Sequence, residues 1–369
     1  MQIEAWMTTQ GIVQVFGLPQ FFLKTDEKGL PVLILAKVVD DLIIAGKPEE
    51  IQAFHAAVSK RFKVGRFLTD GTLIFNRLYI EQRADGSIKA DMREFLDKIK
   101  PLEISRSRRR EQRERCTESE VRSFLALTGA LNYLGLGIMP QAAFIASHLQ
   151  QSVSRLTVAH LCTANKCLEE IKSLHPEILY ATPEQFDNPS YLAFSDASQG
   201  KTSYGQTGYV SGIYIPSKHK PQSIFHMIDW LSQKQSRVSF SAIGAEILAA
   251  ATSADRGSMM AERITLAMSR KTPLPFILTV DSHGLYSTIT TLHDGQDYRL
   301  RPTVSRMRDS FENEEITVIQ WIPGVLNFAD ALTKRNLQMF RDLIKVARDG
   351  TIDCGIFKSA KRARFDSPQ

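Results

Sequence analysis

The second half of the sequence carries the pattern that most constrains the fold. Three strand-like segments are followed by a regular alternation of helical and strand-like segments. The three are YLAFSDAS (191–198), QTGYVSGIYIP (206–216) and SIFHMIDWLSQKQ (223–235). A long helical segment follows at 241–270, then a strand running into a helix at 275–292, and a strand, turn and helix at 316–335. Such an order predicts a mixed α/β sheet with helices packed on it.

Four carboxylates stand at particular points of this pattern. Asp196 ends the first strand, Asp281 ends a later strand, and Asp330 begins the last helix. Glu246 lies inside the long helix and is flanked by small and apolar residues. Strand ends along one edge of an α/β sheet often form sites, and a helix on that sheet can add one more acid. Each aspartate alone is more typical of a turn or helix cap, but together the four predict one cluster.

Carboxylates gathered in one place repel one another unless cations neutralise them. Oxygen ligands favour Mg²⁺ or Mn²⁺, and two such ions about 4 Å apart would suit hydrolysis of a phosphodiester. Neighbouring polar residues are weaker candidates for substrate contacts, with a turn role as the alternative for each: Ser195, Ser198, Ser282 and His283. His226 and Trp230 are expected to lie in the core or on a face of the sheet.

Two adjacent acids, Asp40 and Asp41, interrupt the apolar segment VLILAKVVDDLIIAG (32–46). Buried carboxylates are costly unless they are paired or bound to a cation, so a buried strand here is unexpected. The segment follows another strand-like stretch across a charged turn and is therefore predicted to be the second arm of a hairpin. A helix and a second hairpin are expected beyond it, at 47–62 and at 72–82 with 87–92.

The middle of the chain combines a charge run with helical segments. Six arginines fall within 105–115, which fits either a solvated loop or a strip that contacts phosphates. Residues 117–185 are predicted to be helical, and Thr117 with Glu120 resembles a capping box. The polar tail is expected to be disordered, and its KSAKRAR (358–364) fits either a nuclear import signal or a solvated end.

Composition places limits on the class of protein. A chain of 369 residues can hold two or three domains of roughly 100–200 residues. The net charge of +6 favours a polyanionic partner. Four cysteines without a CxxC pair argue against a zinc ribbon and a disulfide framework. Without a signal peptide or an uncharged apolar run of about 18 residues, the chain is expected to be intracellular, cytoplasmic or nuclear, and not secreted or membrane-bound.

Several of these segments resemble a known family. AFSDAS, GAEILAA, LTVDSHGLYSTI and QWIPGVLNFADALTKR resemble the ribonuclease H (RNase H) domain of copia-type LTR retrotransposons. KVVDDLIIAG resembles the reverse-transcriptase palm motif, and LYIEQRADGSIKADMREFLDKI the stretch that follows it. The resemblance implies four units: a partial palm at 1–104, a basic linker and helical connector at 105–186, an RNase H-like domain with a mixed five-stranded sheet flanked by helices at 187–345, and a basic tail at 346–369.

The resemblance also implies an activity. The chain would hydrolyse the RNA strand of RNA–DNA hybrids with two Mg²⁺ or Mn²⁺ ions. The ions would be held by Asp196, Glu246, Asp281 and Asp330, which would be both catalytic and metal-binding. Its partners would be the hybrid and the rest of a retroelement polyprotein, of which this chain would be the C-terminal piece.

Polymerase activity is not expected from this chain alone. Asp40 and Asp41 would be palm metal ligands, but the family takes a third carboxylate from an earlier strand. Asp26, the only aspartate upstream, lies in a predicted turn. Val38 and Arg77 also depart from the residues usual in the family.

Two alternatives stay open. One is a decayed, non-catalytic relic that binds nucleic acid, and the other is an interaction module that uses the fold only as a scaffold. The presence of all four acids favours catalysis.

Overall fold

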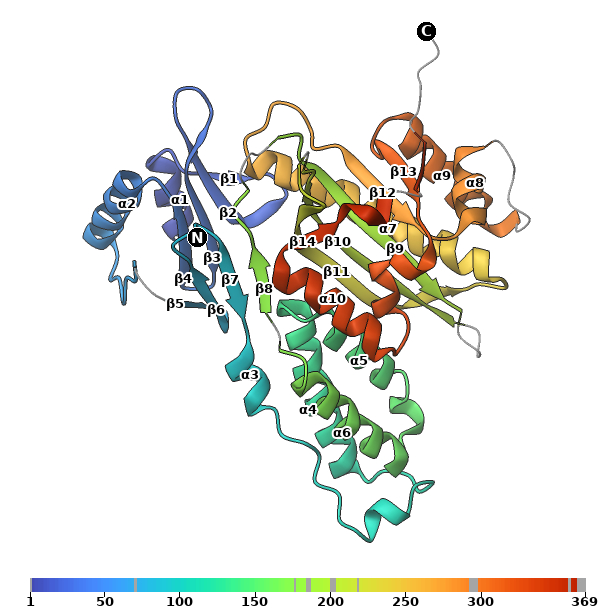
Figure 1. Ribbon diagram of the computed structural model, residues 1–369. Helices are drawn as coiled ribbons and strands as arrows, with labels where there is room; N and C mark the ends of the chain where they lie inside the picture. The colour runs from blue at the N-terminus through green and yellow to red at the C-terminus, as the bar shows by residue number, and fades with distance from the viewer. Residues whose placement is uncertain are drawn as a thin grey trace.

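The computed structural model describes residues 2–69, 72–175, 177–183, 187–199, 204–217, 219–291, 298–357 and 360–363. Two four-stranded sheets and one seven-stranded sheet form in this part of the chain. Figure 1 shows the first sheet on one side of the large sheet, with a group of helices below the large sheet. No helix in the described ranges is long and apolar enough to span a membrane.

The N-terminal unit is an antiparallel sheet in the order β1-β2-β3-β4 with two helices. Its elements are α1 (Gln2–Thr9), β1 (Val13–Val15), β2 (Leu18–Thr25), β3 (Pro31–Val38), β4 (Asp41–Gly46) and α2 (Pro48–Arg61). Its core includes Met7, Phe22, Leu35 and Phe54. The apolar segment 32–46 is thus two paired strands, and the turn at Val39 (φ 53°) and Asp40 leaves Asp40 and Asp41 exposed.

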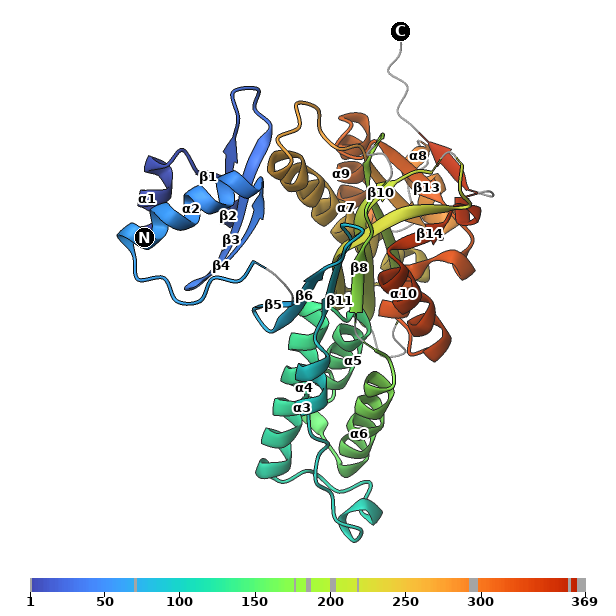
Figure 2. The same ribbon diagram turned by 60° about the vertical axis from the view of Figure 1, so that its left-hand side comes forward.

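The second sheet is built from segments that are far apart in sequence. Its strands are β5 (Thr72–Phe75), β6 (Leu78–Gln82), β7 (Ile88–Asp91) and β8 (Glu177–Tyr180), and α3 (Arg93–Lys98) follows β7. The stretch 72–82, expected as one hairpin arm, is itself a hairpin, because Asn76 and Arg77 turn the chain at positive φ (49° and 65°). The end of the predicted helical region is also a strand: β8 pairs antiparallel with β7, and Figure 2 shows β8 beside the strands of this sheet.

The helical unit between these strands packs on one face of the large sheet. It consists of η1 (Arg108–Arg110), α4 (Glu118–Gly137), α5 (Pro140–Gln150), η2 (Val153–Arg155) and α6 (Val158–Lys172). The predicted capping box is present: the Thr117 hydroxyl accepts from the Glu120 amide at 3.3 Å, and Glu120 accepts from the Thr117 amide at 2.7 Å. Trp230 is buried and donates to the carbonyl of Gly135 at 2.5 Å, so its predicted core role is confirmed.

The large sheet has the strand order β14-β11-β10-β9-β12-β13-β15. The strands are β9 (Ser190–Ser198), β10 (Tyr204–Ile215), β11 (Gln222–Val238), β12 (Phe276–Val280), β13 (Val318–Trp321), β14 (Thr351–Asp353) and β15 (Lys361–Ala363). Strands β9, β10 and β11 form an antiparallel meander, whereas β12 runs parallel to β9 and β13 parallel to β12. The five central strands therefore have the order and directions of the RNase H-like fold, as the resemblance predicted.

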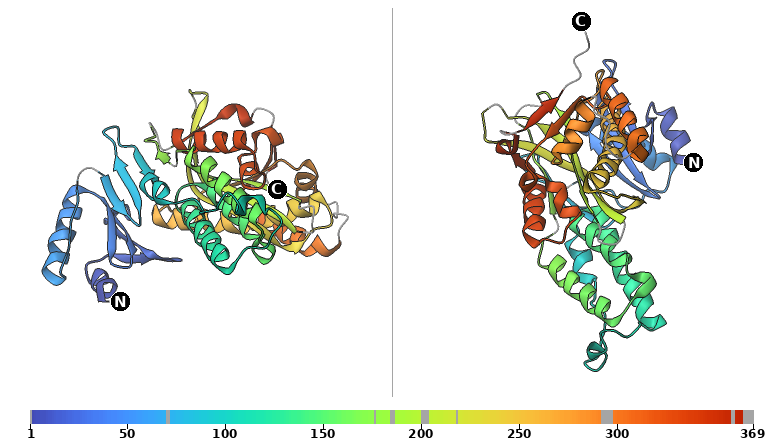
Figure 3. Two further views of the ribbon diagram at one scale, coloured as in Figure 1. Left: turned by 90° about the horizontal axis from the view of Figure 1, so that it is seen from below. Right: turned by 90° about the vertical axis from the view of Figure 1, so that its right-hand side faces the viewer.

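Helices cover both faces of this sheet (Figure 3). They are α7 (Ala242–Ala267), α8 (His283–Thr290), α9 (Arg301–Glu312) and α10 (Leu337–Asp349), with short 3-10 helices η3 (Tyr298–Leu300), η4 (Gly324–Leu326), η5 (Phe328–Leu332) and η6 (Cys354–Phe357). Side chains of β9 alternate between the faces. Tyr191 and Ala193 pack with α7, α8 and α9, whereas Leu192 and Phe194 pack with α10 and the helical unit.

Two features of the C-terminal region differ from the sequence prediction. Asp330 lies in η5 rather than at the start of the last helix, which begins at Leu337. Beyond residue 345 the chain completes α10, turns at Gly350 (φ 64°), and adds β14 and β15 to the two edges of the sheet. Edge strands offer unpaired backbone groups, which explains how polar segments expected to be disordered become ordered. Residues 358, 359 and 364 of KSAKRAR lie outside the described residues.

Candidate active site

Strand register brings the first two predicted acids together. In the parallel pair β9 and β12, Val280 lies beside Ser195, so Asp281 and Asp196 are next to each other at the ends of the paired segments. Oxygen atoms of Asp196, Asp281 and Asp330 all lie within 4.8 Å of one another. Asp196 is 1% exposed and Asp330 is 6% exposed. Three of the four acids predicted from the sequence therefore form one compact, largely buried group.

The short helix η5 delivers Asp330 to the sheet. Asn327 caps η5 by accepting from the amide of Ala329 at 3.1 Å, and its side-chain amide donates to the carbonyl of Ser195 at 2.9 Å. Gly208 pairs with Asp196 across the sheet, and a Cβ at this position would lie 2.6 Å from the carbonyl oxygen of Ala329. The bare backbone at Gly208 therefore allows η5 to lie directly against β9 and β10.

One cation and one hydroxyl complete the group. The ammonium of Lys334 lies 2.8 Å from Asp330 Oδ1 and 3.8 Å from Asp196 Oδ2. The hydroxyl of Thr333 donates to Asp196 Oδ2. Sequence reasoning missed Asn327, Thr333 and Lys334, although all three lie within a few residues of Asp330. Sequence reasoning also missed Gly208, for which the available signal was a glycine inside a predicted strand.

Burial and repulsion between carboxylates raise the pKa values of Asp196, Glu246 and Asp281. The pKa of Asp196 is well above its usual range because of burial, and because Asp330 and Glu246 are near. Burial and the charge of Asp281 raise the pKa of Glu246 to about 8. Burial and the charge of Asp330 raise the pKa of Asp281. Lys334 alone therefore does not balance the negative charge of the ionised carboxylates. A divalent cation would relieve the remaining repulsion.

The donor set fits a hard divalent cation. Asp196, Asp281 and Asp330 offer only carboxylate oxygens, which suit Mg²⁺ or Mn²⁺. Glu246, which lies in the first turns of α7, is half-buried and stands outside the group of three, although its charge acts on Asp196. The structure thus assembles three of the predicted ligands and places the fourth close by.

The weaker candidates have different surroundings. Ser195 is 1% exposed and accepts from the hydroxyl of Ser253 in α7 at 2.9 Å, so its side chain faces the core. Ser282 caps α8 by accepting from the amide of Leu285 at 3.3 Å. Ser198 is half-buried at the end of β9. His283 is exposed, with Nε2 3.0 Å from Lys361 Nζ.

The aspartate pair near the N-terminus has a different setting. Asp40 and Asp41 are exposed on the β3–β4 turn. Within the described part of the chain, no third carboxylate joins them in a cluster that could hold a metal. They therefore lack the ligand set found at Asp196.

A groove lies on the side of the large sheet that α7 and α9 cover. Its volume is about 400 Å³, and it runs between the β10–β11 strands and helices α7 and α9. Thr207, Gln235 and Arg237 line one wall, and Asp255 and Arg306 line the other. The side-chain amide of Gln235 donates to the carbonyl of Ala245 at 2.8 Å, which places this wall one residue from Glu246. Sequence reasoning missed the groove because its walls come from separate elements.

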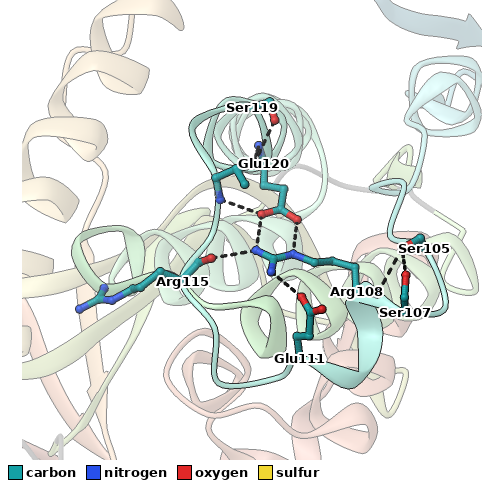
Figure 4. A network of polar contacts seen from close by, with 8 residues as sticks. Ser105, Ser107, Arg108, Glu111, Arg115, Ser119 and Glu120 are labelled. Carbon is teal, nitrogen blue, oxygen red and sulfur yellow. Dashed lines mark hydrogen bonds and ion pairs between the residues drawn. The ribbon is translucent and has the colours of Figure 1, made fainter.

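The arginine-rich segment 105–115 is partly structural (Figure 4). Arg108 forms two hydrogen bonds with Glu120, at 2.9 and 3.0 Å, and one with Glu111 at 2.7 Å. The guanidinium lowers the pKa of Glu120 to about 2. Arg106, Arg110 and Arg113 are exposed, so the segment keeps free positive charge at the far end of the helical unit.

Comparisons with known proteins add the following. No protein-family model matches the sequence, and no curated protein matches it. RNase H1 from the halophilic archaeon Halobacterium salinarum NRC-1 is 18% identical, with a TM-score of 0.29 over 39% of this chain and 93% of that chain. LC11-RNase H1, isolated from compost, is 13% identical, with a TM-score of 0.30 over 40% of this chain and 96% of that chain.

A foamy viral protease-reverse transcriptase, solved in complex with an RNA/DNA hybrid, is 14% identical with a TM-score of 0.44. The match covers 77% of this chain but only 35% of the viral chain. At these scores the assignment of the fold rests on the strand order and directions of the large sheet.

Proposed function

We propose that this chain is a metal-dependent endonuclease that hydrolyses the RNA strand of RNA–DNA hybrids. The observation that carries the proposal is the group formed by Asp196, Asp281 and Asp330, whose oxygens lie within 4.8 Å of one another on an RNase H-like sheet. The pKa values of Asp196 and Asp281 are raised, and Lys334 is the one cation paired with the group in the described residues, so these acids are poorly explained as turn residues.

Each residue of the group has a role in this proposal. Asp196, Asp281 and Asp330 would hold Mg²⁺ or Mn²⁺, and Glu246 would complete the set if two ions bind. When bound, such ions supply Lewis-acid stabilisation of the phosphodiester and lower the pKa of a nearby water. Thr333 holds Asp196 in place by its hydrogen bond. Lys334 neutralises part of the charge before a cation arrives.

The groove beside Glu246 supports a double-stranded substrate. Gln233, Ser236 and Arg237 line the groove, are exposed, and present amide, hydroxyl and guanidinium groups along one wall. Contacts of this kind recognise a sugar–phosphate backbone, and hybrid recognition depends on the shape of the helix and on the 2′-hydroxyls of the RNA strand. We therefore assign the groove to the strand that is not cut.

Cleavage of defined duplexes tests the proposal. The purified chain is incubated with Mg²⁺ and an end-labelled RNA–DNA hybrid, double-stranded RNA or double-stranded DNA. We expect cuts only in the RNA of the hybrid. Asp281→Asn should abolish them, whereas Asp342→Asn, on the exposed surface of α10, should cut like the wild type. Failure of the wild-type chain to cut the hybrid would refute the proposal.

We further propose that the chain derives from the C-terminal part of a copia-type LTR retrotransposon polyprotein, divided into the four units given above. Asp40 and Asp41 would then be the remnant of a palm metal site. Their exposure without a third carboxylate in the described residues supports the expectation that this chain alone does not polymerise. Template-dependent incorporation of dNTPs by the purified chain would overturn that expectation.

The exposed arginines favour a second candidate, a protein that binds nucleic acid without cutting it. Arg106, Arg110 and Arg113 are exposed near the tip of the helical unit. Under this alternative, hybrid binding would weaken steeply with salt while no cleavage occurs. The duplex assay separates the two candidates directly.

A further inference from the structure

The C-terminal strand β15 places a lysine beside Trp321, which is hydrogen-bonded to the backbone of Asp281. Strand β15 pairs antiparallel with β13, and the register sets Lys361 opposite Trp321. Directly opposed residues in antiparallel strands project to the same face of the sheet. Lys361 Nζ accordingly lies over the Trp321 ring, 5.6 Å from its centroid. The next residue, Arg362, instead donates to the side chain of Gln320 at 2.7 Å.

Trp321 connects this lysine to the site. Its indole N–H donates to the backbone carbonyl of Asp281 at 2.8 Å, so the ring is fixed beside one of the three clustered acids. His283 lies edge-on to the ring, with centroids 5.7 Å apart, and its Nε2 is 3.0 Å from Lys361 Nζ. We call Lys361, His283 and Trp321 the rim cluster.

The rim cluster has the chemistry of a phosphate site. An ammonium carries three donors and no acceptor, so Lys361 uses one donor on His283 and has others free for a ligand. Lys361 and His283 are both exposed. Across the residues that the structure places, no carboxylate pairs with Lys361. An ammonium with free donors and no acidic partner suits an oxyanion rather than a metal cation.

We propose that the rim cluster binds a backbone phosphate of the nucleic acid, next to the phosphodiester held at Asp196, Asp281 and Asp330. This inference rests on the proposed function. A single exposed lysine attracts a free phosphate ion only weakly, whereas a polyanion already held at the groove presents its next phosphate at high local concentration. The C-terminal segment would then be a working part of the substrate site.

Binding of a fluorescently labelled RNA–DNA hybrid, measured without divalent ions over a range of salt concentrations, gives the first test. Lys361→Gln keeps the backbone of β15 and removes the charge. We expect a roughly fivefold higher Kd at low salt and a slope of log Kd against log salt that is lower by about 0.7 to 0.9. Lys345→Gln, an exposed lysine of α10, is the matched control and should bind like the wild type.

A second test locates the contact. Hybrids carry one neutral methylphosphonate at successive positions on either strand. In the wild-type protein one or two adjacent positions should weaken binding, and Lys361→Gln should lose that sensitivity while a Tm near that of the wild type shows an intact fold. Inorganic phosphate at millimolar concentration should not displace the hybrid from the wild-type protein. Unchanged binding and salt dependence in Lys361→Gln, or an unchanged methylphosphonate profile, would overturn the inference.

The two proposals can fail separately. Absence of RNA cleavage by the wild-type chain would refute the proposed nuclease activity but leave the binding assays informative, because they use no divalent ion. Cleavage with no effect of Lys361→Gln on binding would refute only the rim cluster.

Discussion

Gly208 lies directly opposite Asp196 in the antiparallel pair β9–β10, and its missing side chain lets the segment carrying Asp330 reach Asp196. A Cβ at 208 would lie 2.6 Å from the Ala329 carbonyl oxygen and 2.7 Å from Thr333 Cγ2. Real Cβ atoms do not approach backbone atoms so closely. The position of Asp330 beside Asp196 therefore depends on close packing of the η5 backbone against the backbone of β10 at Gly208.

Gly208→Ala should consequently impair the site. We expect the added methyl group to push η5 away from the sheet, and so to lower hybrid cleavage by at least about tenfold and stability by roughly 1–3 kcal/mol. Single-turnover cleavage rates and thermal unfolding measure the two effects. Gly129→Ala is the matched control, because Gly129 is exposed in α4 and its Cβ would meet nothing within 4 Å. That change should raise stability slightly, and equal damage from both substitutions would contradict this account.

The raised pKa values predict how stability depends on pH without divalent ions. The folded protein holds a proton on Glu246 up to about pH 8, whereas an unfolded chain releases it near its usual value of 4.5. Between these values the folded state binds more protons, so stability falls as pH rises. Asp196 and Asp281 act in the same direction.

Mg²⁺ should reverse this loss, because it favours the ionised carboxylates. We expect Mg²⁺ to raise Tm more at pH 8 than at pH 5.5, as measured by scanning calorimetry. In Asp281→Asn the increase at pH 8 should shrink. A Mg²⁺-induced rise in Tm that is the same at both pH values would count against a cation site at these acids.

Lys334 should compete with the cation. Its ammonium pairs with Asp330 and Asp196, and its side chain is 47% exposed. Lys334→Gln removes the only cation seen at these acids in the described residues, and we expect the metal-free protein to lose roughly 1 kcal/mol. We also expect a larger Mg²⁺-induced rise in Tm than in the wild type. Lys345→Gln controls for the general loss of one positive charge, and an unchanged Mg²⁺ response in Lys334→Gln would argue against competition.

Arg108 should stabilise the start of the helical unit. Its bidentate contact with Glu120 lowers the pKa of that carboxyl to about 2, so the contribution is complete above the unfolded pKa of 4.5 and disappears as pH falls toward 2. Arg108→Gln should lower Tm at pH 7, and the difference from the wild type should shrink below pH 4.5. Arg110→Gln, an exposed neighbour, should leave Tm nearly unchanged. A difference that persists at pH 2 would contradict this role.

The sequence predicts the part of the fold that depends on long periodic segments. The meander, the long helix with Glu246 and the strand before Asp281 all emerge from local pattern, and the parallel register then brings Asp281 to Asp196. The resemblance adds the strand order. These features are recoverable because each is encoded within one continuous stretch of chain.

The remaining features depend on contacts between distant segments. Strands β8, β14 and β15 have only three or four residues each and are stabilised by pairing with sheet edges. Asp330 lies in a 3-10 turn because Asn327 anchors that turn to Ser195. Lys334 and Gly208 acquire their roles only when η5 packs on the sheet. Local sequence pattern carries no direct signal for such pairings.

The most direct test of the central claim is a Mg²⁺ titration of RNA cleavage under single-turnover conditions. The wild-type chain and Asp281→Asn are compared on the same end-labelled RNA–DNA hybrid. We predict no cleavage without divalent ion, a rate that rises and saturates with Mg²⁺ in the wild type, and at least a roughly hundredfold lower rate in Asp281→Asn at every concentration. An uncut hybrid at all Mg²⁺ concentrations, or equal rates for the two proteins, would contradict the claim that these carboxylates form a nuclease site.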